Sequence, residues 1–462
     1  MRIGIIGGGI SGLTAAYECE KLGLDWRLYE ATSHLGGTIA TVRRDGFVLE
    51  GGPDGWVTEK PWARELAHEL GLEDELISSN DSTRKTYILI DGKLQAIPDH
   101  MRMMVPLDLK ALEGSPLFSE EARAVYAAEL DRAEELRASA PPEDESVASF
   151  VLRHFGEEVL TTLAAPLLSG VFGGDVYKLS VRAVMPQFVV MEREYGSLIA
   201  GLQAKAGNRP PKPIFTSLRS GIGTLIDALL ARLPAERIHR NTPVDKITQD
   251  NDGWLLHTRT GSIAFDCLLL ATPVDATYKL LQGIDAAAVA LLPCEASSAI
   301  IAALAWPAES AATFAIPQGF GLLVPSASAP VGRPALMAAT FMDQKFPHRV
   351  PTGARILRAF FGGASAEALF PRTDEEIATE SLAQLRTLLG PIPEPDPSLT
   401  VVRRLPRSLP QYEIGHLERI AELEQRIACI KGLHLLGNAY RGVGLPDLIR
   451  DARAKVRSLQ QR

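Results

Sequence analysis

The sequence predicts a mixed α/β and α+β protein, in which a discontinuous Rossmann-like domain is joined to an antiparallel-sheet domain and an inserted helical domain. Three observations carry this prediction. The chain opens with an apolar strand, a glycine turn, a helix and a second strand. Residues 101–205 are largely helical in pattern, and residues 296–400 contain several short apolar strands followed by one helix. At 462 residues the chain also exceeds the size, about 250–300 residues, at which single cores stop growing.

The first 30 residues predict a dinucleotide site. Residues 3–6 are apolar and uncharged, as a strand buried on both faces requires. Gly7, Gly9 and Gly12 follow at G-x-G-x-x-G spacing, which suits a tight turn, a close approach of diphosphate and close packing of the next helix. Glu30 ends the second strand, where a carboxylate can bind a ribose diol. The alternative is a glycine turn with an unrelated surface glutamate.

Gly36 and Gly37 indicate which dinucleotide binds. A glycine pair after the ribose carboxylate resembles the extended signature of large two-domain flavoproteins, which hold FAD stretched out. A plain NAD site does not need this pair.

Composition limits the functional classes. The net charge of −8 and pI of 5.7 argue against a nucleic-acid binder. The four cysteines are scattered without a C-x-x-C pair, so we expect free thiols in a reducing cytoplasm and neither disulfides nor a metal site. The chain begins directly in a strand, which predicts no signal peptide, and no run reaches ~18 uninterrupted apolar residues. We therefore expect a cytoplasmic protein.

The rest of the chain alternates turns with periodic segments. We expect helices over residues 62–77, 119–138 and 147–168, and a glycine-rich loop over 169–175. We expect Thr373 and Glu376 to form a capping box, and Pro446 to lie in the first turn of the last helix. Residues 267–270 should return the chain to the nucleotide-binding sheet. Four strand turns are predicted, at Asp45-Gly46, Asp91-Gly92, Asp252-Gly253 and Thr260-Gly261.

These segments suggest three domains, of which two are discontinuous. The predicted ranges are 1–84, 206–292 and 401–462 for the FAD-binding domain, 85–100 and 293–400 for the substrate-binding domain, and 101–205 for the inserted helical domain.

Several motifs together carry a family resemblance. Those shared across a wide flavoprotein group are GxGxxG, Glu30, Gly36-Gly37, LLLATP and GNAYRGVGLPD. More specific ones are SGVFGGDVYKLS, EREYGSL, LRSGIGTL, GFGLLVP, TFMDQKFPHR, RAFFGG and LPQYEIGH. Their order and content resemble the FAD-dependent, oxygen-dependent porphyrinogen oxidases of haem biosynthesis. These belong to the monoamine-oxidase-like flavoproteins and include protoporphyrinogen oxidases and Gram-positive-type coproporphyrinogen III oxidases.

The resemblance implies a set of FAD contacts. For the adenosine and diphosphate half they are Gly7, Gly9, Ser11, Gly12, Glu30, Gly36, Gly37, Thr38 and, at the adenine, Val244. For the isoalloxazine end they are Gly437, Asn438, Val443, Gly444 and Leu445. The last helix would then point its positive end at the flavin carbonyl. Val244 could instead only pack a strand, and Asn438 could only shape a turn.

The resemblance also implies substrate contacts, on an apolar slot for a wide tetrapyrrole. Gly170 matches a position whose carbonyl binds a pyrrole N–H. Phe320, Leu323, Thr340 and Phe360 match slot-lining positions, although each could be ordinary core.

Two positions depart from the family pattern. Thr86 stands where mitochondrial and plant enzymes have an arginine that pairs with a substrate propionate, which favours coproporphyrinogen III as substrate. Positive charge could then come from Arg84, Lys85, Arg182 or Arg349. Leu405 stands where the family often has a tryptophan near the flavin.

The implied reaction removes six electrons from a porphyrinogen in three rounds, with dioxygen as acceptor and hydrogen peroxide as product. No catalytic side chain or metal is demanded, and His416 is interpreted as structural. An amine or polyamine oxidase is one alternative, although Cys429 lies outside the glycine loop where a covalent flavin link would be expected. A non-catalytic flavin-binding scaffold is another.

Two further expectations concern partners. Residues 101–105 either touch a membrane or line the mouth of the substrate channel, or they form core beneath the helical domain. The resemblance leaves room for a homodimer and for peripheral contact with the inner face of the cell membrane.

Overall fold

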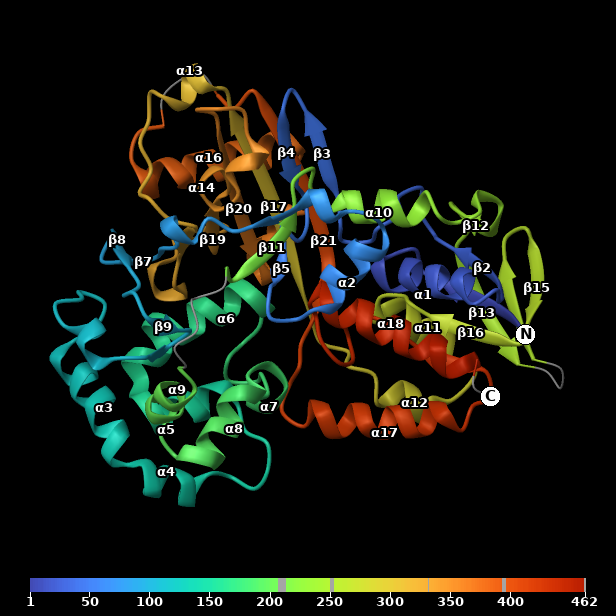
Figure 1. Cartoon of the computed structure of the whole chain (residues 1–462), viewed down its shortest axis with the longest axis horizontal. Coiled ribbons are helices and arrows are strands. Elements are labelled where there is room, and N and C mark those ends of the chain that lie inside the picture. Colours follow the sequence, from blue (N-terminus) through green and yellow to red (C-terminus); the bar gives the residue numbers. More distant parts are fainter. Residues whose placement is uncertain (207–212, 250–252, 331, 393–395, 461–462) are drawn as a thin grey trace.

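The computed structural model describes residues 1–206, 213–249, 253–330, 332–392 and 396–460. Figure 1 shows three groups of elements. The nucleotide-binding elements and both termini lie at the right, a helical group lies at the lower left, and a long-stranded sheet with its helices lies at the upper left. The predicted combination of a Rossmann-like unit, a strand-rich part and a helical part is therefore confirmed.

A five-stranded parallel sheet forms the centre of the nucleotide-binding part. Its strands in spatial order are β12 (Ile238–His239), β2 (Asp25–Tyr29), β1 (Arg2–Ile6), β16 (Cys267–Leu270) and β22 (Leu433–Leu435). The strand predicted at 267–270 pairs directly with β1, so the chain does return to this sheet after the intervening segments.

Helices cover one face of this sheet, and a meander with three further helices covers the other. On the first face lie α1 (Ile10–Lys21), α2 (Trp62–Glu69), α10 (Gly223–Leu230) and α18 (Leu445–Gln460). On the second lie β13 (Val244–Gln249), β14 (Trp254–Thr258), β15 (Gly261–Phe265), α11 (Val274–Leu281), α12 (Ala286–Ala290) and α17 (His416–Ala428).

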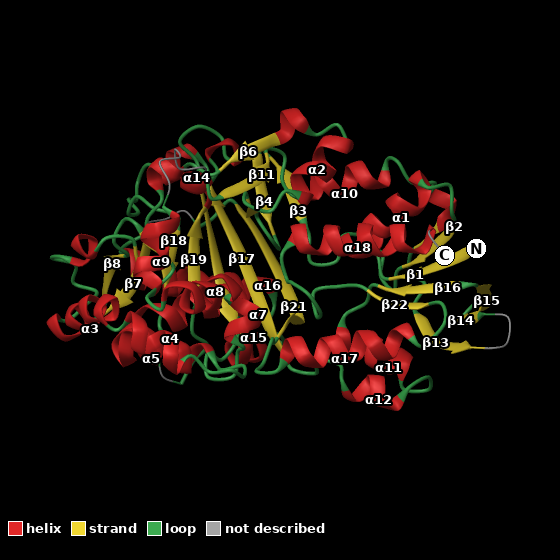
Figure 2. Ribbon diagram, turned by 60° about the horizontal axis from the view of Figure 1, so that its bottom comes forward, coloured by secondary structure: helices red, strands yellow, loops and turns green. Residues whose placement is uncertain are grey.

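A seven-stranded sheet runs through the middle of the molecule (Figure 2). Its order is β21 (Leu399–Pro410), β17 (Ala296–Trp306), β20 (Arg355–Gly362), β19 (Ala338–Phe341), β18 (Gly321–Leu323), β7 (Thr86–Ile90) and β8 (Lys93–Ala96). Neighbouring strands are antiparallel except β18 and β7, which are parallel. β21 carries this sheet to Pro410, past residue 400, at which the predicted substrate-binding domain ends.

The two faces of this sheet meet different neighbours. The outer face packs against α15 (Gly363–Leu369) and α16 (Asp374–Leu389), through residues such as Leu322 and Phe361. The side that we call the inner face carries Ile88, Leu323 and Phe360, which pack against the helical part. Side chains point to alternate faces along each strand, and residues that pair directly across neighbouring strands point to the same face.

The helical part has its own core beneath the inner face. Its helices are α3 (Glu120–Asp131), α4 (Ala133–Ser139), α5 (Val147–Val159), α6 (Ala165–Phe172), α7 (Val181–Val184), α8 (Pro186–Tyr195) and α9 (Leu198–Lys205). A π-helical turn at Leu160–Ala164 joins α5 to α6. Met104 and Val105 are buried in this core and Met101 packs against it, which agrees with the core interpretation of residues 101–105.

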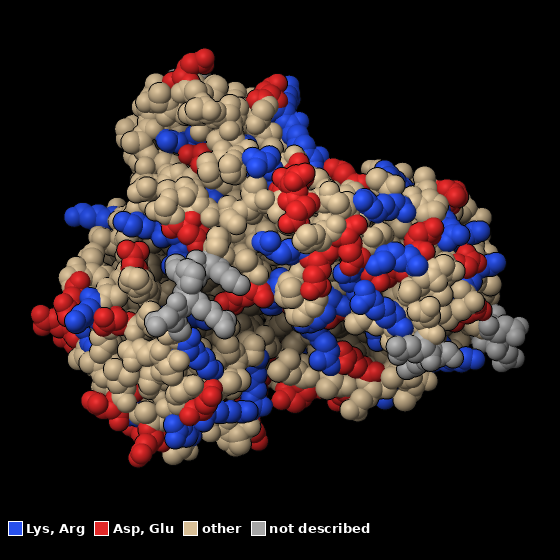
Figure 3. Space-filling view, viewed as in Figure 1, with Lys and Arg blue, Asp and Glu red and all other residues tan. Residues whose placement is uncertain are grey.

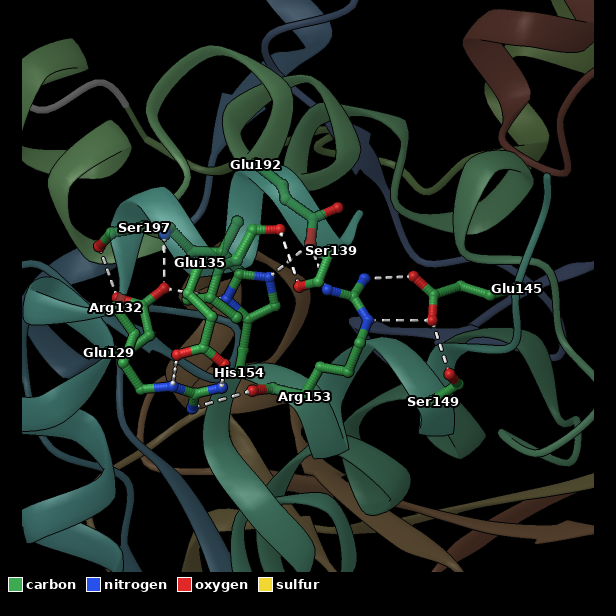
Figure 4. A network of polar contacts seen from close by, with 12 residues as sticks. Glu129, Arg132, Glu135, Ser139, Glu145, Ser149, Arg153, His154, Glu192 and Ser197 are labelled. Atoms are coloured by element: carbon green, nitrogen blue, oxygen red, sulfur yellow. Dashed lines mark hydrogen bonds and ion pairs between the residues drawn. The ribbon is translucent and has the colours of Figure 1, made fainter. Parts of the chain in front are cut away.

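A buried polar network ties these helices together (Figure 4). His154 on α5 lies with Nδ1 3.0 Å from Glu129 Oε1 on α3, and with Nε2 3.0 Å from Glu192 Oε1 on α8. Arg153 donates to Glu192 at 2.6 Å, and the Ser197 hydroxyl donates to Glu129 at 2.5 Å. Burial alone would lower the pKa of His154, but the bonds to Glu129 and Glu192 outweigh it and raise the pKa. Glu192 and Ser197 belong to EREYGSL, so this motif serves to join helices.

Most of the predicted turns and helix caps are present in the structure. The turns at Asp45-Gly46 and Asp91-Gly92 are confirmed, with positive φ at all four residues. The Thr373–Glu376 capping box and the position of Pro446 are also confirmed. The turn at Thr260-Gly261 joins β14 to β15, whereas Asp252 lies outside the described residues.

Two helix predictions ran too long. The helix expected over 62–77 ends at Glu69, because Gly71 adopts a φ of 70° and its N–H donates to the His68 carbonyl. Leu76–Ser78 instead forms β6, which pairs with β11 (Phe215–Leu218). The helix expected over 119–138 is divided into α3 and α4 at Arg132.

Three short sheets complete the described strands. They contain β3 (Thr41–Arg44) with β4 (Phe47–Glu50), β9 (Met101–Arg102) with β10 (Val105–Pro106), and β5 (Trp56–Val57) with β11 and β6. Two short helices remain, α13 (Ala308–Ala311) and α14 (Met342–Lys345). Among the described residues no helix is long and apolar enough to cross a membrane. On the face seen in Figure 3, charges of both signs are interspersed.

Candidate active site

The carboxyl edge of the parallel sheet carries the predicted diphosphate site. Gly7 follows β1 with a φ of 107°, and a Cβ there would lie 2.4 Å from the Ala271 carbonyl oxygen. A Cβ on Gly12 would lie 1.9 Å from the Gly7 carbonyl oxygen. Gly9 forms a bridge with Gly36. Side chains at Gly7 and Gly12 would therefore block the turn and the packing of the helix on it.

The start of α1 is open to an anion. Gly9 is its N-cap, no side chain caps it, and no acidic residue lies in its first turn, which contains Ser11. Gly37 lies over this turn, since a Cβ on it would be 3.2 Å from the Gly9 Cα. The first N–H groups of a helix lack partners within the helix, and the helix dipole favours negative charge there. This backbone-lined cradle fits a diphosphate.

Glu30 is held beside the cradle. Its Oε2 accepts the Gly8 N–H at 2.8 Å, and its Oε1 accepts the Thr32 N–H and hydroxyl at 2.9 Å. The Glu30 N–H donates to the His239 carbonyl at 2.9 Å, and the Thr242 N–H donates to the Glu30 carbonyl at 2.8 Å. The carboxylate is thus oriented before any ligand binds, where a ribose diol is expected.

Two predicted contacts flank this half of the site. Val244 begins β13 and packs against the core that contains Ile6 and Tyr29, and two residues before it Thr242 bonds to the Glu30 carbonyl at the end of β2. Thr38 is exposed, and its carbonyl oxygen would lie 1.9 Å from a Cβ on Gly52. The segment that follows the cradle, at Thr38, therefore packs against the turn that follows β4, at Gly52.

The glycine loop at the other end of the site is held by Tyr412. Its hydroxyl donates to the Asn438 carbonyl at 2.6 Å and accepts the Gly442 N–H at 2.9 Å. Its ring stacks on His416 with centroids 3.9 Å apart and planes at 13°. His416 Nε2 donates to the Tyr440 carbonyl at 2.9 Å, and burial lowers the pKa of His416 to about 4, so the ring is neutral near pH 7. The structural interpretation of His416 agrees with this geometry.

The predicted isoalloxazine contacts lie on this loop. Gly437 adopts a φ of 132°, and the Asn438 amide donates to the Ser408 carbonyl at 2.9 Å. Val443 and Gly444 are half-buried, and the buried Leu445 begins α18. Since α18 packs along α1, the helix starts that carry the predicted diphosphate contacts and the predicted isoalloxazine contacts belong to one face of the parallel sheet.

Four of the predicted substrate contacts share the inner face by register: Thr86, Leu323, Thr340 and Phe360. Thr340 Oγ1 is buried and has no hydrogen-bond partner among the described residues. Gly170 on α6 approaches the same face, because its Cβ would lie 3.3 Å from Leu323 Cδ2, and yet Gly170 is exposed. Four predicted positions therefore share one face, Gly170 lies against it at Leu323, and this face carries one unsatisfied hydroxyl.

Gly170 lies on a helix and not on the expected loop. The loop predicted over 169–175 is wrong for its first four residues, because α6 runs to Phe172 and ends at Gly173, which is left-handed with a φ of 62°. The Gly173 N–H donates to the Ser169 carbonyl at 2.8 Å. In the last turn of a helix carbonyls lose their intrahelical partners, so this position suits a carbonyl that accepts an N–H from a ligand.

Phe320 does not share the inner face. The Phe341 N–H donates to its carbonyl at 2.8 Å, and Phe341 belongs to the core on the outer face. Strand alternation therefore directs Phe320 away from Leu323 and Phe360. Leu405 on β21 pairs with Ala299 on β17, and it is half-buried.

Arg349, expected as a source of positive charge for the substrate, instead interacts with buried groups of the protein. It is fully buried, its Nη1 lies 3.1 Å from Glu50 Oε1, and its Nη2 donates to Ser217 Oγ at 2.6 Å. Asp54 lies in the same buried group, 3.0 Å from Lys345 Nζ. Burial alone would raise the pKa of Asp54, but neighbouring Lys345, Arg358 and Arg349 outweigh it and lower the pKa to about 2.

Of the other three expected cations, two lie near a carboxylate. Arg182 lies 3.4 Å from Glu418, and Arg84 lies 4.0 Å from Asp81. Lys85 is exposed and directly precedes β7, so strand alternation turns it outward. Three of the four expected cations therefore already have a carboxylate of the protein as a neighbour.

Comparison with known proteins agrees with this geometry. The family described as flavin containing amine oxidoreductase matches residues 10–458. Coproporphyrinogen III oxidase from Bacillus subtilis is 32% identical, over 98% of this chain and 96% of that protein. Chloroplastic protoporphyrinogen oxidase from Nicotiana tabacum is 28% identical, over 97% of this chain and 83% of that protein.

A solved structure covers the whole chain. The crystal structure of a presumed protoporphyrinogen oxidase from Exiguobacterium sp. 255-15 superimposes with a TM-score of 0.87 at 32% identity, covering 100% of this chain and 98% of that one. The glycine cradle, Glu30 and the loop before α18 fit FAD, which is the cofactor. The chain thus belongs to the flavin-containing amine oxidoreductase family, and within it is similar over nearly its whole length to coproporphyrinogen III and protoporphyrinogen oxidases.

Proposed function

We propose that the protein oxidises coproporphyrinogen III to coproporphyrin III in haem biosynthesis. The observation that carries the proposal is the inner face, which Leu323, Thr340 and Phe360 share by register, which Gly170 approaches at Leu323, and on which the Thr340 hydroxyl has no partner among the described residues. An apolar surface with one or two polar groups suits a wide, largely apolar ring. The coproporphyrinogen III oxidase relatives, which match nearly the whole chain, support the same assignment.

The reaction balances with dioxygen as the electron acceptor. One porphyrinogen and three dioxygen molecules give one porphyrin and three hydrogen peroxide molecules, as six electrons and six protons leave the macrocycle. Bound FAD would accept the electrons in pairs and pass them to dioxygen.

The protein's own part is to bind and orient the substrate. The named inner-face positions Thr86, Leu323, Thr340 and Phe360 carry no titratable group, so they provide no general base. The carbonyl of Gly170 would accept a pyrrole N–H and fix one edge of the ring. The side chains of α6 and of the inner face would exclude water from the reacting carbons.

Thr86 supports coproporphyrinogen III over protoporphyrinogen IX. It occupies the inner face opposite Gly321, where it offers a hydroxyl and no charge. A single fixed arginine at this position would suit a substrate with two carboxylates, whereas four carboxylates around the ring can be bound elsewhere. Protoporphyrinogen IX remains the second candidate, because plant relatives named for that activity match 97% of the chain.

Porphyrin fluorescence tests the proposal. FAD-loaded protein is mixed with coproporphyrinogen III, protoporphyrinogen IX or putrescine in air, and fluorescence and hydrogen peroxide are followed. We expect the fastest porphyrin formation with coproporphyrinogen III, with three peroxides per porphyrin. Rates equal to autoxidation with both porphyrinogens would reject the proposal. If only putrescine gives peroxide, the result would instead support an amine oxidase. If none of the three compounds is turned over, the result would support a flavin-binding scaffold.

We also propose that the three parts act as the domains predicted above, with the last boundary moved to follow β21. The peripheral membrane contact and the homodimer are tested by sedimentation with liposomes and by light scattering. Because residues 101–105 pack on the helical core, we expect this segment to give no liposome binding.

A further inference from the structure

Arg403 lies on the inner face in the same row as the predicted substrate contacts. It pairs with Ile301 on β17, which pairs in turn with Phe360 on β20. The row continues through Ala338 to Leu323. Directly paired residues point to the same side of a sheet, so Arg403 shares its side with Phe360, two strand spacings or roughly 10 Å away.

The stem of Arg403 lies against the turn that joins this face to the FAD cradle. A Cβ on Gly51 would lie 2.4 Å from Arg403 Cγ and 3.2 Å from its Cδ. The Gly51 N–H donates to the Ala40 carbonyl at 2.8 Å, and the next residue, Gly52, packs on the Thr38 carbonyl. Arg403 therefore stands between the predicted substrate surface and the chain segment that follows the predicted FAD contacts.

The guanidinium of Arg403 is half-buried, yet it makes no ion pair or hydrogen bond with any residue that the structure describes. Its neighbour Arg404 donates to the Phe370 and Arg372 carbonyls and pairs with Asp374. Arg358, also on the inner face, pairs with Asp54 at 3.2 Å. Burial lowers the pKa of Arg403, with no carboxylate to offset it. A partly desolvated cation without a partner is unfavourable, and an anionic ligand would relieve it.

We propose that Arg403 binds a propionate carboxylate of the tetrapyrrole substrate, and so supplies the positive charge that the protein lacks at Thr86. The inference rests on the proposed function. The planar guanidinium donates two parallel N–H bonds to a carboxylate, which fits a group on the rim of a ring lying over Phe360. The four carboxylates of coproporphyrinogen III give more ways to place one at Arg403 than the two of protoporphyrinogen IX.

Binding of the oxidised product provides a test that does not depend on turnover. FAD-loaded wild type and Arg403→Met are titrated with coproporphyrin III and with its tetramethyl ester, which lacks the carboxylates, and quenching of flavin fluorescence gives each Kd. We expect Arg403→Met to weaken binding of the acid on the order of ten- to a hundred-fold and to leave the ester unchanged. Arg403→Lys should recover part of the loss.

Arg404→Met is the matched control. It removes an arginine from the adjacent position of β21, on the outer face, and should leave both Kd values as in wild type. Thermal unfolding and FAD content confirm that each variant is folded.

Three outcomes would overturn the assignment: unchanged acid binding in Arg403→Met, an equal loss for acid and ester, or unchanged porphyrin binding with a shifted flavin potential. The last result would mean that Arg403 faces the flavin. If wild type prefers the acid through Arg403 but oxidises neither porphyrinogen, the proposed function fails while the carboxylate site stands.

Discussion

Replacing Tyr412 with Phe tests whether this residue holds the flavin-end loop. The change removes the hydroxyl and keeps the ring, so the stack on His416 at 3.9 Å is preserved. Two hydrogen bonds are lost, one at 2.6 Å to the Asn438 carbonyl and one at 2.9 Å from the Gly442 N–H. At about 0.5–1.5 kcal/mol each, their sum is about 1–3 kcal/mol. If the loop loosens locally, the loss appears as a roughly 5- to 150-fold rise in the Kd for FAD.

The assay is a titration of apoprotein with FAD, together with urea unfolding of the FAD-loaded protein. Tyr177→Phe serves as the control, because Tyr177 is 56% exposed and lies on the loop after α6. We expect the control to match wild type in both measurements. An FAD Kd and an unfolding midpoint unchanged in Tyr412→Phe would show that the loop does not depend on this hydroxyl, and would refute the reasoning.

Three further predictions concern FAD binding, the pH dependence of stability and substrate preference. Glu30→Ala should weaken FAD binding by about 1.5–3 kcal/mol, because a charge-assisted bond to the ribose is lost, and an unchanged Kd by titration would reject the ribose role. The bonds to Glu129 and Glu192 raise the pKa of His154, so the stability that protonated His154 contributes is complete below the unfolded pKa of about 6.5 and is lost as pH rises through the folded pKa. Urea unfolding should therefore show that wild type loses stability over that pH range and that His154→Gln loses less. Parallel pH curves for the two proteins would contradict the assignment. Thr86→Arg should shift kcat/KM towards protoporphyrinogen IX, since it adds one fixed charge to the inner face, and an unchanged ratio of the two substrates would count against it.

Local chemistry was enough to predict the nucleotide-binding unit. The glycine spacing from Gly7, the carboxylate at Glu30 and the apolar strand 267–270 each satisfy a requirement that no distant residue can replace. The Thr373 capping box is similar, because its two hydrogen bonds lie within four residues. The capping box and the bond from Gly8 to Glu30 can be predicted because their partners are close in sequence, whereas strand 267–270 was predicted from its apolar composition and pairs with β1 about 260 residues away.

The errors arose where distant contacts decide local structure. Gly170 lies within a helix because α6 continues from α5 and packs against the inner face, a contact that outweighs the low helix propensity of glycine. Leu76 joins a strand because β11, about 140 residues later, is available to pair with it. Helical and strand periods are hard to distinguish in such short apolar runs.

The candidate site was predicted in part for the same reason. Position in the family pattern identified Thr340 and Phe360, but only strand register shows that they share a face and that Phe320 does not. Arg403 was missed, although the pattern of β21 offered a signal. Val401, Arg403 and Leu405 are every second residue of this long strand, so they lie on the same side. An arginine between two apolar residues of that side indicates a cation on a half-buried, otherwise apolar surface.

In the proposed reaction the flavin takes electrons directly from coproporphyrinogen III. The most direct measurement is anaerobic mixing of FAD-loaded protein with that substrate, followed by the visible absorbance of oxidised flavin. We expect the flavin absorbance to bleach as porphyrin absorbance appears, and putrescine to cause no bleaching. Flavin that stays oxidised with coproporphyrinogen III would rule out this electron transfer.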